Sequence, residues 1–243
     1  MGYINKFDLI LALLEGTPLD QSELLSRVNR QEILRKIYKK EPELENIGKF
    51  FITENPVEEE KWSEIPGRDK KKILKLNSKI KKSLDLGRVI TELTNFKEKY
   101  PNVPTIYNYL TIAYNYADQT DKYCECLIET VEKFPGYIFG KISLSEYYLN
   151  NNEFKKIPGL LDNKFEITQH YPPGTEVFHI SAVRGFYYIT GRYFAKAGKI
   201  EKAFRSFFLL SDLDRAHQTT ELLGEEILNY ELNALKALFK KRK

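Results

Sequence analysis

The chain has 243 residues, of which 42% are hydrophobic, 30% are charged and 13% are aromatic. This balance is typical of a folded protein with a sizeable core and argues against an intrinsically disordered chain. The net charge of +4 is too small to indicate, by itself, a nucleic acid or an anionic membrane as partner. The two cysteines, Cys124 and Cys126, are too few for a disulfide framework. We therefore expect a reducing compartment and a cytoplasmic location.

The first 69 residues are predicted to be a helical region followed by a linker. The opening run "MGYINKFDLILALLEG" is interrupted by Asp8 and lacks the small-residue cleavage site of a signal peptide. A capping-box pattern, "DQSE" at 20–23, precedes apolar residues at helical spacing, so residues 1–52 are expected to be helical. Two prolines and a glycine make 53–69 a linker with at most a short turn. No apolar stretch approaches the ~18 residues of a membrane span, so no membrane partner is expected.

Farther along the chain, prolines end helical patterns at a regular interval. Pro101 and Pro135 are 34 residues apart, which is the period of a helix–turn–helix repeat. Large, Leu-like, small and aromatic residues recur in the same order in four units. This pattern resembles the tetratricopeptide repeat family over about residues 70–217. The resemblance implies an all-α fold, a right-handed α-solenoid of antiparallel helix pairs whose helices have about 12–15 residues. The units lie at about 70–103, 104–137, 138–172 and 184–217.

The last unit shows why residue size matters in this pattern. Gly191 and Ala203 are small because the two helices of the unit are expected to cross closely there. Phe194 and Phe207 are large because they fill the space between those helices. Gly198 stands in the turn "AGKI", where a positive φ costs glycine least.

Two further segments are assigned to the end of the solenoid and to a helix start. Residues 218–243 are predicted to be a capping helix with a basic tail, because solenoids need ends that are apolar inside and polar outside. The apolar positions of this helix are Leu222, Leu223, Ile227, Leu228, Leu235 and Leu238. The stretch "VFHIS" at 177–181 resembles the start of a long helix in bacterial repeat proteins.

The sequence offers no catalytic or metal-binding set. Cys124 and Cys126 lie on a predicted second helix without two further ligands nearby, so we interpret them as packing residues and not as half of a metal site. No Cys or Asp stands at nucleophile-like or metal-like spacing from the three histidines, His170, His179 and His217. No glycine-rich phosphate loop is present. The chain is therefore predicted to be no enzyme and to use no metal or other cofactor.

In the tetratricopeptide repeat family, the first helices of successive units line a concave groove. The corresponding positions here carry amides, tyrosines and charges, which suit an extended peptide. The groove-facing residues implied by the resemblance are Lys71, Lys81, Lys82, Asn108, Asn115, Tyr116, Glu146, Asn150, Tyr188, Arg192 and Lys196. Ile112, Gly185 and Ile189 stand where the family's clamp for a C-terminal carboxylate needs polar or basic residues. That specificity is therefore not implied.

The leading functional hypothesis is a protein-interaction scaffold that binds a protein or peptide. Cations outnumber anions in the groove set, so an acidic partner is one expectation, and Arg192 and Lys196 are expected to be exposed. The lysine-rich run 68–82 is interpreted as a solvated face or as an electrostatic patch. One alternative is a structural protein that associates with itself, for example as a homodimer. Another is an RNA-binding helical repeat, although the aromatic residues fall at core positions and not among the basic ones, which disfavours nucleic acid.

Overall fold

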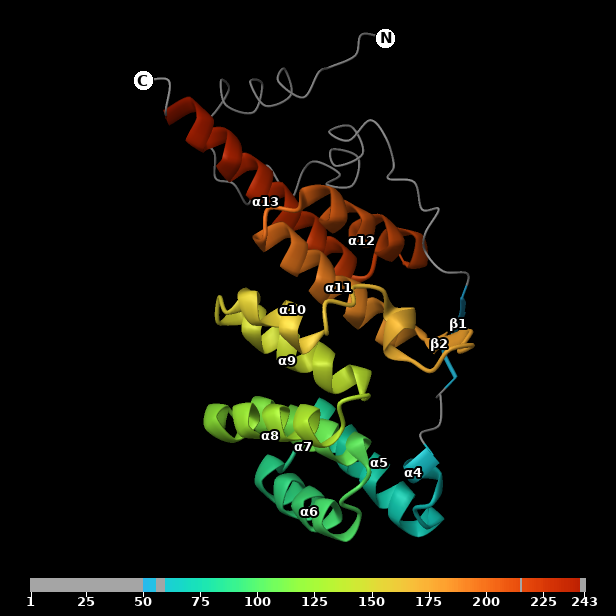
Figure 1. The fold of residues 1–243 in the computed structure, drawn as a ribbon. Helices are drawn as coiled ribbons and strands as arrows, with labels where there is room; N and C mark the ends of the chain where they lie inside the picture. Colours follow the sequence, from blue (N-terminus) through green and yellow to red (C-terminus); the bar gives the residue numbers. More distant parts are fainter. Residues whose placement is uncertain (1–49, 56–59, 215, 241–243) are drawn as a thin grey trace. The chain divides into compact units, whose positions relative to one another are not determined.

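The computed structural model describes residues 50–55, 60–214 and 216–240, most of which are helical (Figure 1). The chain is thus mostly α-helical, as the sequence predicts. Most of the helical region expected at 1–52 lies outside the described residues, but its end was predicted wrongly, because Phe51 and Ile52 belong to a strand. The chain divides into two compact units, one of which ends at Ile189 while the other includes the residues from Thr190 onward.

Five helices of the first unit follow one another, and each contacts the next. They are α5 (Gly67–Lys81), α6 (Leu86–Lys99), α7 (Pro104–Tyr116), α8 (Thr120–Lys133) and α9 (Ile138–Asn150). The starts of α6 and α8 are 34 residues apart, and so are those of α7 and α9. Pro104 is the first residue of α7. The N–H groups in the first turn of a helix have no hydrogen-bond partner within the helix, so proline, which lacks an N–H, is tolerated there. The described residues of the expected linker, 53–69, include the end of a strand at Thr53, the short helix α4 (Glu60–Ser63) and the first residues of α5.

The core of the first unit forms from the apolar faces of these helices. Ile73, Leu76 and Ile80 of α5 are almost completely buried, as their spacing predicts. They belong to one cluster with Leu93 of α6 and Leu110 of α7. Burying each such side chain contributes about 1.5–3 kcal/mol. This packing holds α7 in place, and α7 carries much of the candidate site.

After α9 the structure departs from the predicted repeat. A second helix of about 12–15 residues was expected there, but the chain forms a 3₁₀ turn, η1 (Phe154–Lys156), and a four-residue helix, α10 (Ile157–Leu160). Pro158 is tolerated only in the first turn of a helix. Asp162 and Asn163 then take φ values of 54° and 56°, which end the helix. A second 3₁₀ turn, η2 (Ile167–His170), follows.

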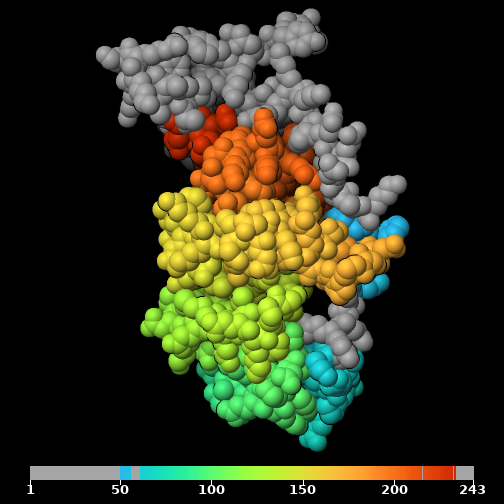
Figure 2. Space-filling view, viewed as in Figure 1, coloured from blue at the N-terminus to red at the C-terminus, as the bar shows by residue number. Residues whose placement is uncertain are grey.

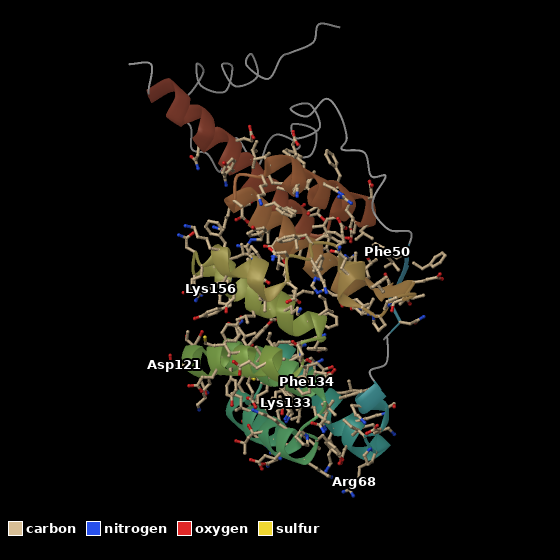
Figure 3. The ribbon with its side chains drawn as sticks, in the orientation of Figure 1. Phe50, Arg68, Asp121, Lys133, Phe134 and Lys156 are labelled. Carbon is tan, nitrogen blue, oxygen red and sulfur yellow. The ribbon has the colours of Figure 1, made fainter. Side chains whose placement is uncertain are left out.

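A short parallel strand pair joins two distant parts of the first unit. β1 (Phe51–Thr53) pairs with β2 (Val177–His179), and Figures 1 and 2 show the two segments side by side. The interpretation of 177–181 as a helix start was wrong by three residues, because α11 (Ile180–Lys196) begins only after the strand. Phe178 is buried in the strand, with the ring centroids of Phe50 (labelled in Figure 3) and Tyr171 at 5.2 and 4.9 Å from its own. Aromatic and β-branched residues favour such an extended segment.

The second unit contains the end of α11 together with α12 (Ile200–Leu213) and α13 (Gln218–Lys240). Its packing confirms the residue sizes expected where α11 and α12 cross. Ala203 and Phe207 are buried, and a Cβ added to Gly191 would lie 2.9 Å from the Cβ of Ser206. Gly198 has a φ of +72°, as expected for the turn.

Helix α13 packs on α12 by part of the predicted apolar face. Leu223, Ile227 and Leu228 are buried. Leu222 is 40% exposed, so its assignment to the buried face was wrong. The side chains of Leu235 and Leu238 lie outside the described residues.

Candidate functional site

A cavity of about 510 Å³ opens at the N-terminal ends of α7, α9 and α11, beside β2. We call it the aromatic cavity because five rings line it, those of Tyr109, Tyr137, Phe139, Tyr171 and Phe178. Among its other lining residues are Thr105, Asn108, His179 and Ser181. Its size is typical of cavities that hold a small molecule or an anchoring side chain of a partner.

Local contacts hold the walls of the aromatic cavity. The rings of Tyr137 and Phe139 lie 5.7 Å apart at the start of α9. Burial raises the pKa of Tyr171 to about 12, so its hydroxyl stays protonated at neutral pH. The backbone N–H of Ser181 donates to Nδ1 of His179 at 3.2 Å, and Nε2 of His179 lies 3.3 Å from the carbonyl oxygen of Glu54. A His179 ring with its proton on Nε2 satisfies both contacts and ties β2 to the end of β1.

A second hollow, of about 320 Å³, lies where α7 and α9 end and α8 begins. We call it the polar pocket. Its lining residues are Asn115, Asp118, Gln119, Thr120, Tyr123, Glu146, Tyr147, Asn150 and Asn151. Two of these carry carboxylates and none is basic. The pocket is therefore rich in hydrogen-bond acceptors and has negative charge.

The turn between α7 and α8 forms one wall of the polar pocket. Asp118 has a left-handed φ of 53°, and its N–H donates to the carbonyl of Asn115 at 3.2 Å. The N–H of Gln119 donates to the carbonyl of Tyr114 at 3.0 Å. Asp and Asn adopt this left-handed conformation more readily than most residues. The turn thereby places Asp118 at the pocket.

Two tyrosines, Tyr123 and Tyr147, also line the polar pocket, with ring centroids 5.9 Å apart. Burial, and then the charge of Glu146, raises the pKa of Tyr123 to about 12. The pKa of Tyr147 is also raised, first by a hydrogen bond with the Cys124 thiol and then by burial. Both phenols are therefore neutral at physiological pH.

The structure brings together part of the predicted groove set. Asn115, Glu146 and Asn150 line the polar pocket, and Asn108 lines the aromatic cavity. The remaining residues of the set in the first unit line neither hollow. Of these, Lys71, Lys81, Lys82 and Tyr116 are exposed and Tyr188 is half-buried.

Two predicted groove cations of the second unit are not free for a partner. Arg192 was expected to be exposed, but only 13% of its side chain is, and its Nε lies 2.7 Å from a carboxylate oxygen of Glu226 in α13. The Nζ of Lys196 lies 3.8 Å from the other carboxylate oxygen of Glu226. The expectation of exposure was therefore wrong for Arg192, because Glu226 of α13 supplies a carboxylate opposite it, and the side chain of Lys196 is only 30% exposed.

Two other side chains with reactive or charged groups, Cys126 and Lys141, form hydrogen bonds inside the protein. Cys126 is buried and accepts a hydrogen bond from the hydroxyl of Thr111 at 3.2 Å, and burial raises the pKa of its thiol. Lys141 is buried, and its ammonium donates to Asp162 at 3.1 Å. Within the described ranges, no three His, Cys, Asp or Glu side chains are grouped as metal ligands would be.

Sequence reasoning missed the aromatic residues of the cavity and the turn residues of the polar pocket. The repeat pattern assigns faces only to helix positions, so it is silent on Asp118 and Gln119, which lie between helices. A signal for the aromatic cavity was present in "YIF" at 137–139 and "VFH" at 177–179, where rings fall outside the repeat's core positions.

Comparison with protein-family models, with curated proteins and with solved structures finds no match to this chain. In the part of the chain that the structure describes, no helix is both long and apolar enough to cross a membrane.

Proposed function

We propose that this chain is a non-enzymatic scaffold that binds a peptide or protein partner along α7 and α9. The helix pairs would then be units of a right-handed α-solenoid similar to tetratricopeptide repeats, with the first helix of each unit facing the partner. The 34-residue offset between corresponding helices supports this assignment. One observation carries the functional proposal. The aromatic cavity and the polar pocket both open beside α7 and α9, at opposite ends of these two helices.

This arrangement suits a partner that is held by a few side chains. Aromatic pockets that exclude water are where interfaces gain most of their affinity. An extended peptide also exposes unpaired backbone N–H and C=O groups. Asn108 and Asn115 lie on α7 beside the two hollows, and each amide can both donate to and accept from a peptide backbone.

Self-association is the second candidate, and it is supported by the strand pair. Phe51 is 68% exposed, and Ile52 and Val177 are 39% and 47% exposed. Exposed apolar residues that adjoin one another commonly mark an interaction surface. A second copy of the chain could cover this surface. Light scattering on the purified protein would detect such a dimer.

Selection of a displayed random-peptide library on the full chain tests the leading proposal. Selected peptides should bind with saturable affinity, measured by fluorescence anisotropy. Phe139→Ala removes a ring of the aromatic cavity and should weaken them at least about tenfold. Ile128→Ala is the control, because Ile128 is 41% exposed on α8 and lines neither hollow. Failure to select any peptide, or equal binding by the Phe139 variant, would contradict the proposal. Binding of RNA oligonucleotides that weakens steeply with salt would instead support the nucleic-acid alternative.

A further inference from the structure

We infer that the polar pocket receives an arginine or lysine side chain of the bound peptide, about three residues from the side chain that fills the aromatic cavity. This inference rests on the proposed function, because it names the chemistry of that partner. Four properties of the two hollows support it: charge, hydrogen-bond acceptors, neutral rings and spacing.

The first property is the charge of the polar pocket. Asp118 and Glu146 line it, and none of its lining residues is basic. The nearby Lys122 extends elsewhere, with its Nζ 5.9 Å from the centroid of the Tyr114 ring. Two carboxylates without a cation among the lining residues attract a positive group and repel a carboxylate or a phosphate. The pocket therefore discriminates against an acidic peptide and against a nucleic-acid backbone.

The second property is the supply of hydrogen-bond acceptors. The side-chain amides of Asn115 and Asn151 line the pocket together with the two carboxylates. Each amide has a carbonyl oxygen that accepts hydrogen bonds. An ammonium carries three N–H donors and a guanidinium five, and neither carries an acceptor. Either group matches a pocket of carboxylates and amide oxygens.

The third property is the pair of tyrosine rings. Tyr123 and Tyr147 line the pocket, and both phenols are held neutral by their raised pKa values. The face of a neutral tyrosine ring attracts a cation placed within about 6 Å of its centroid. The aliphatic stem of a lysine or arginine can also pack on such a ring. The rings thus favour the same class of side chain as the carboxylates.

The fourth property is the distance between the two hollows. Asn108 and Phe139 line the aromatic cavity, and Asn115 and Glu146 line the polar pocket. On both α7 and α9 the two positions are seven residues apart, which is two helical turns on one face. At 1.5 Å per residue the separation is about 10.5 Å. An extended peptide advances about 3.3 Å per residue, so its two anchoring side chains lie about three residues apart.

The experiment uses the full chain and synthetic peptides with acetylated and amidated ends. Each peptide carries one phenylalanine, and one arginine placed one to six residues away in either direction. Matched peptides carry citrulline, which is neutral and nearly isosteric, or glutamate at the arginine position. Affinity is measured by competition against a fluorescent peptide of the same series. We expect the arginine peptides at a spacing near three to bind about 10- to 100-fold tighter than their citrulline partners.

Two substitutions remove the negative charge while keeping size. The double variant Asp118→Asn, Glu146→Gln should bind arginine and citrulline peptides about equally, because only the charge preference is lost. Asparagine also tolerates the left-handed φ of Asp118. The control is Glu132→Gln, since Glu132 is exposed on α8 and lines neither hollow. It should keep the full arginine preference.

The possible results separate the inference from the proposed function. Arginine preference that disappears in the double variant and persists in the control supports both. Three results overturn the inference but leave the proposed function standing. The peptides could bind with no charge preference, they could prefer glutamate, or the double variant could keep the arginine preference. If no peptide of any charge binds, the proposed function itself fails and the inference fails with it.

Discussion

Replacing Gly191 by alanine tests how tightly the helices of the second unit pack. The added Cβ would lie 2.6 Å from Cδ2 of Leu223 and 2.9 Å from Cβ of Ser206. Favourable contacts between carbon atoms are at about 3.5–4.0 Å, so both neighbours must move. Leu223 is completely buried and Ser206 is only 4% exposed, so neither can turn into solvent. We expect the single methyl group to strain the crossing of α11 with α12 and α13.

Two opposing effects set the magnitude. Alanine is a better helix former than glycine by about 0.5–1 kcal/mol. Overpacking a well-filled core costs about 1–3 kcal/mol. The clashes involve both another helix and a buried side chain, so we expect the second effect to exceed the first. The free energy of unfolding should fall by about 1–2 kcal/mol.

A double-mutant cycle identifies the cause. Leu223→Ala should by itself cost about 2–5 kcal/mol, because it leaves a cavity beside α11. In that background the clash with Leu223 is absent and only the clash with Ser206 remains, so Gly191→Ala should cost less than in the unchanged protein. The coupling energy between the two sites should then be about 0.5–3 kcal/mol, which is the range found for residues in contact.

The assay is urea denaturation of the full chain, followed by far-ultraviolet circular dichroism. Gly87→Ala serves as the control, because Gly87 lies in the first turn of α6 and a Cβ there meets nothing within 4 Å. The control should be as stable as the unchanged protein or more stable by up to about 1 kcal/mol. If Gly191→Ala is equally harmless, or if Leu223→Ala does not relieve its cost, the helices do not cross closely at this glycine.

Three further changes have defined outcomes. Truncation after Ala216 removes Leu223 and the rest of the buried face of α13, so the product should aggregate or lose cooperative thermal unfolding. Asp162→Asn should destabilise the protein at pH 7 but not near pH 2, in urea titrations at both values. Its carboxylate pairs with buried Lys141, which lowers the pKa of Asp162, so this stabilisation is present above pH 3.8 and lost on acidification. Burial lowers the pKa of His170, so the native state resists its protonation and stability falls below about pH 6.5. His170→Gln should make that fall shallower between pH 7 and pH 5, and an unchanged slope would contradict this reasoning.

Features that depend on neighbouring residues could be predicted from the sequence. The buried face of α5 follows from the spacing of Ile73, Leu76 and Ile80, because helical period alone determines which side chains share a face. The positive φ of Gly198 follows from its place just after a helix end. Features that depend on distant residues could not be predicted. β1 and β2 pair across most of the first unit, and neither strand has a turn or partner nearby in sequence that would reveal it.

The same distinction explains why the expected charge of the partner changes once the structure is known. Asn115, Glu146 and Asn150, three of the positions implied by the family resemblance, do line one pocket, because they lie near the ends of α7 and α9. Position in the repeat pattern cannot show that Arg192 meets Glu226, which belongs to α13, outside the predicted repeat. That pairing removes a cation from the count that suggested an acidic ligand. Asp118, in a turn that the repeat pattern does not describe, adds a carboxylate beside Glu146. The polar pocket therefore favours a basic side chain in the partner. The sum of charges over the predicted groove had suggested an acidic partner.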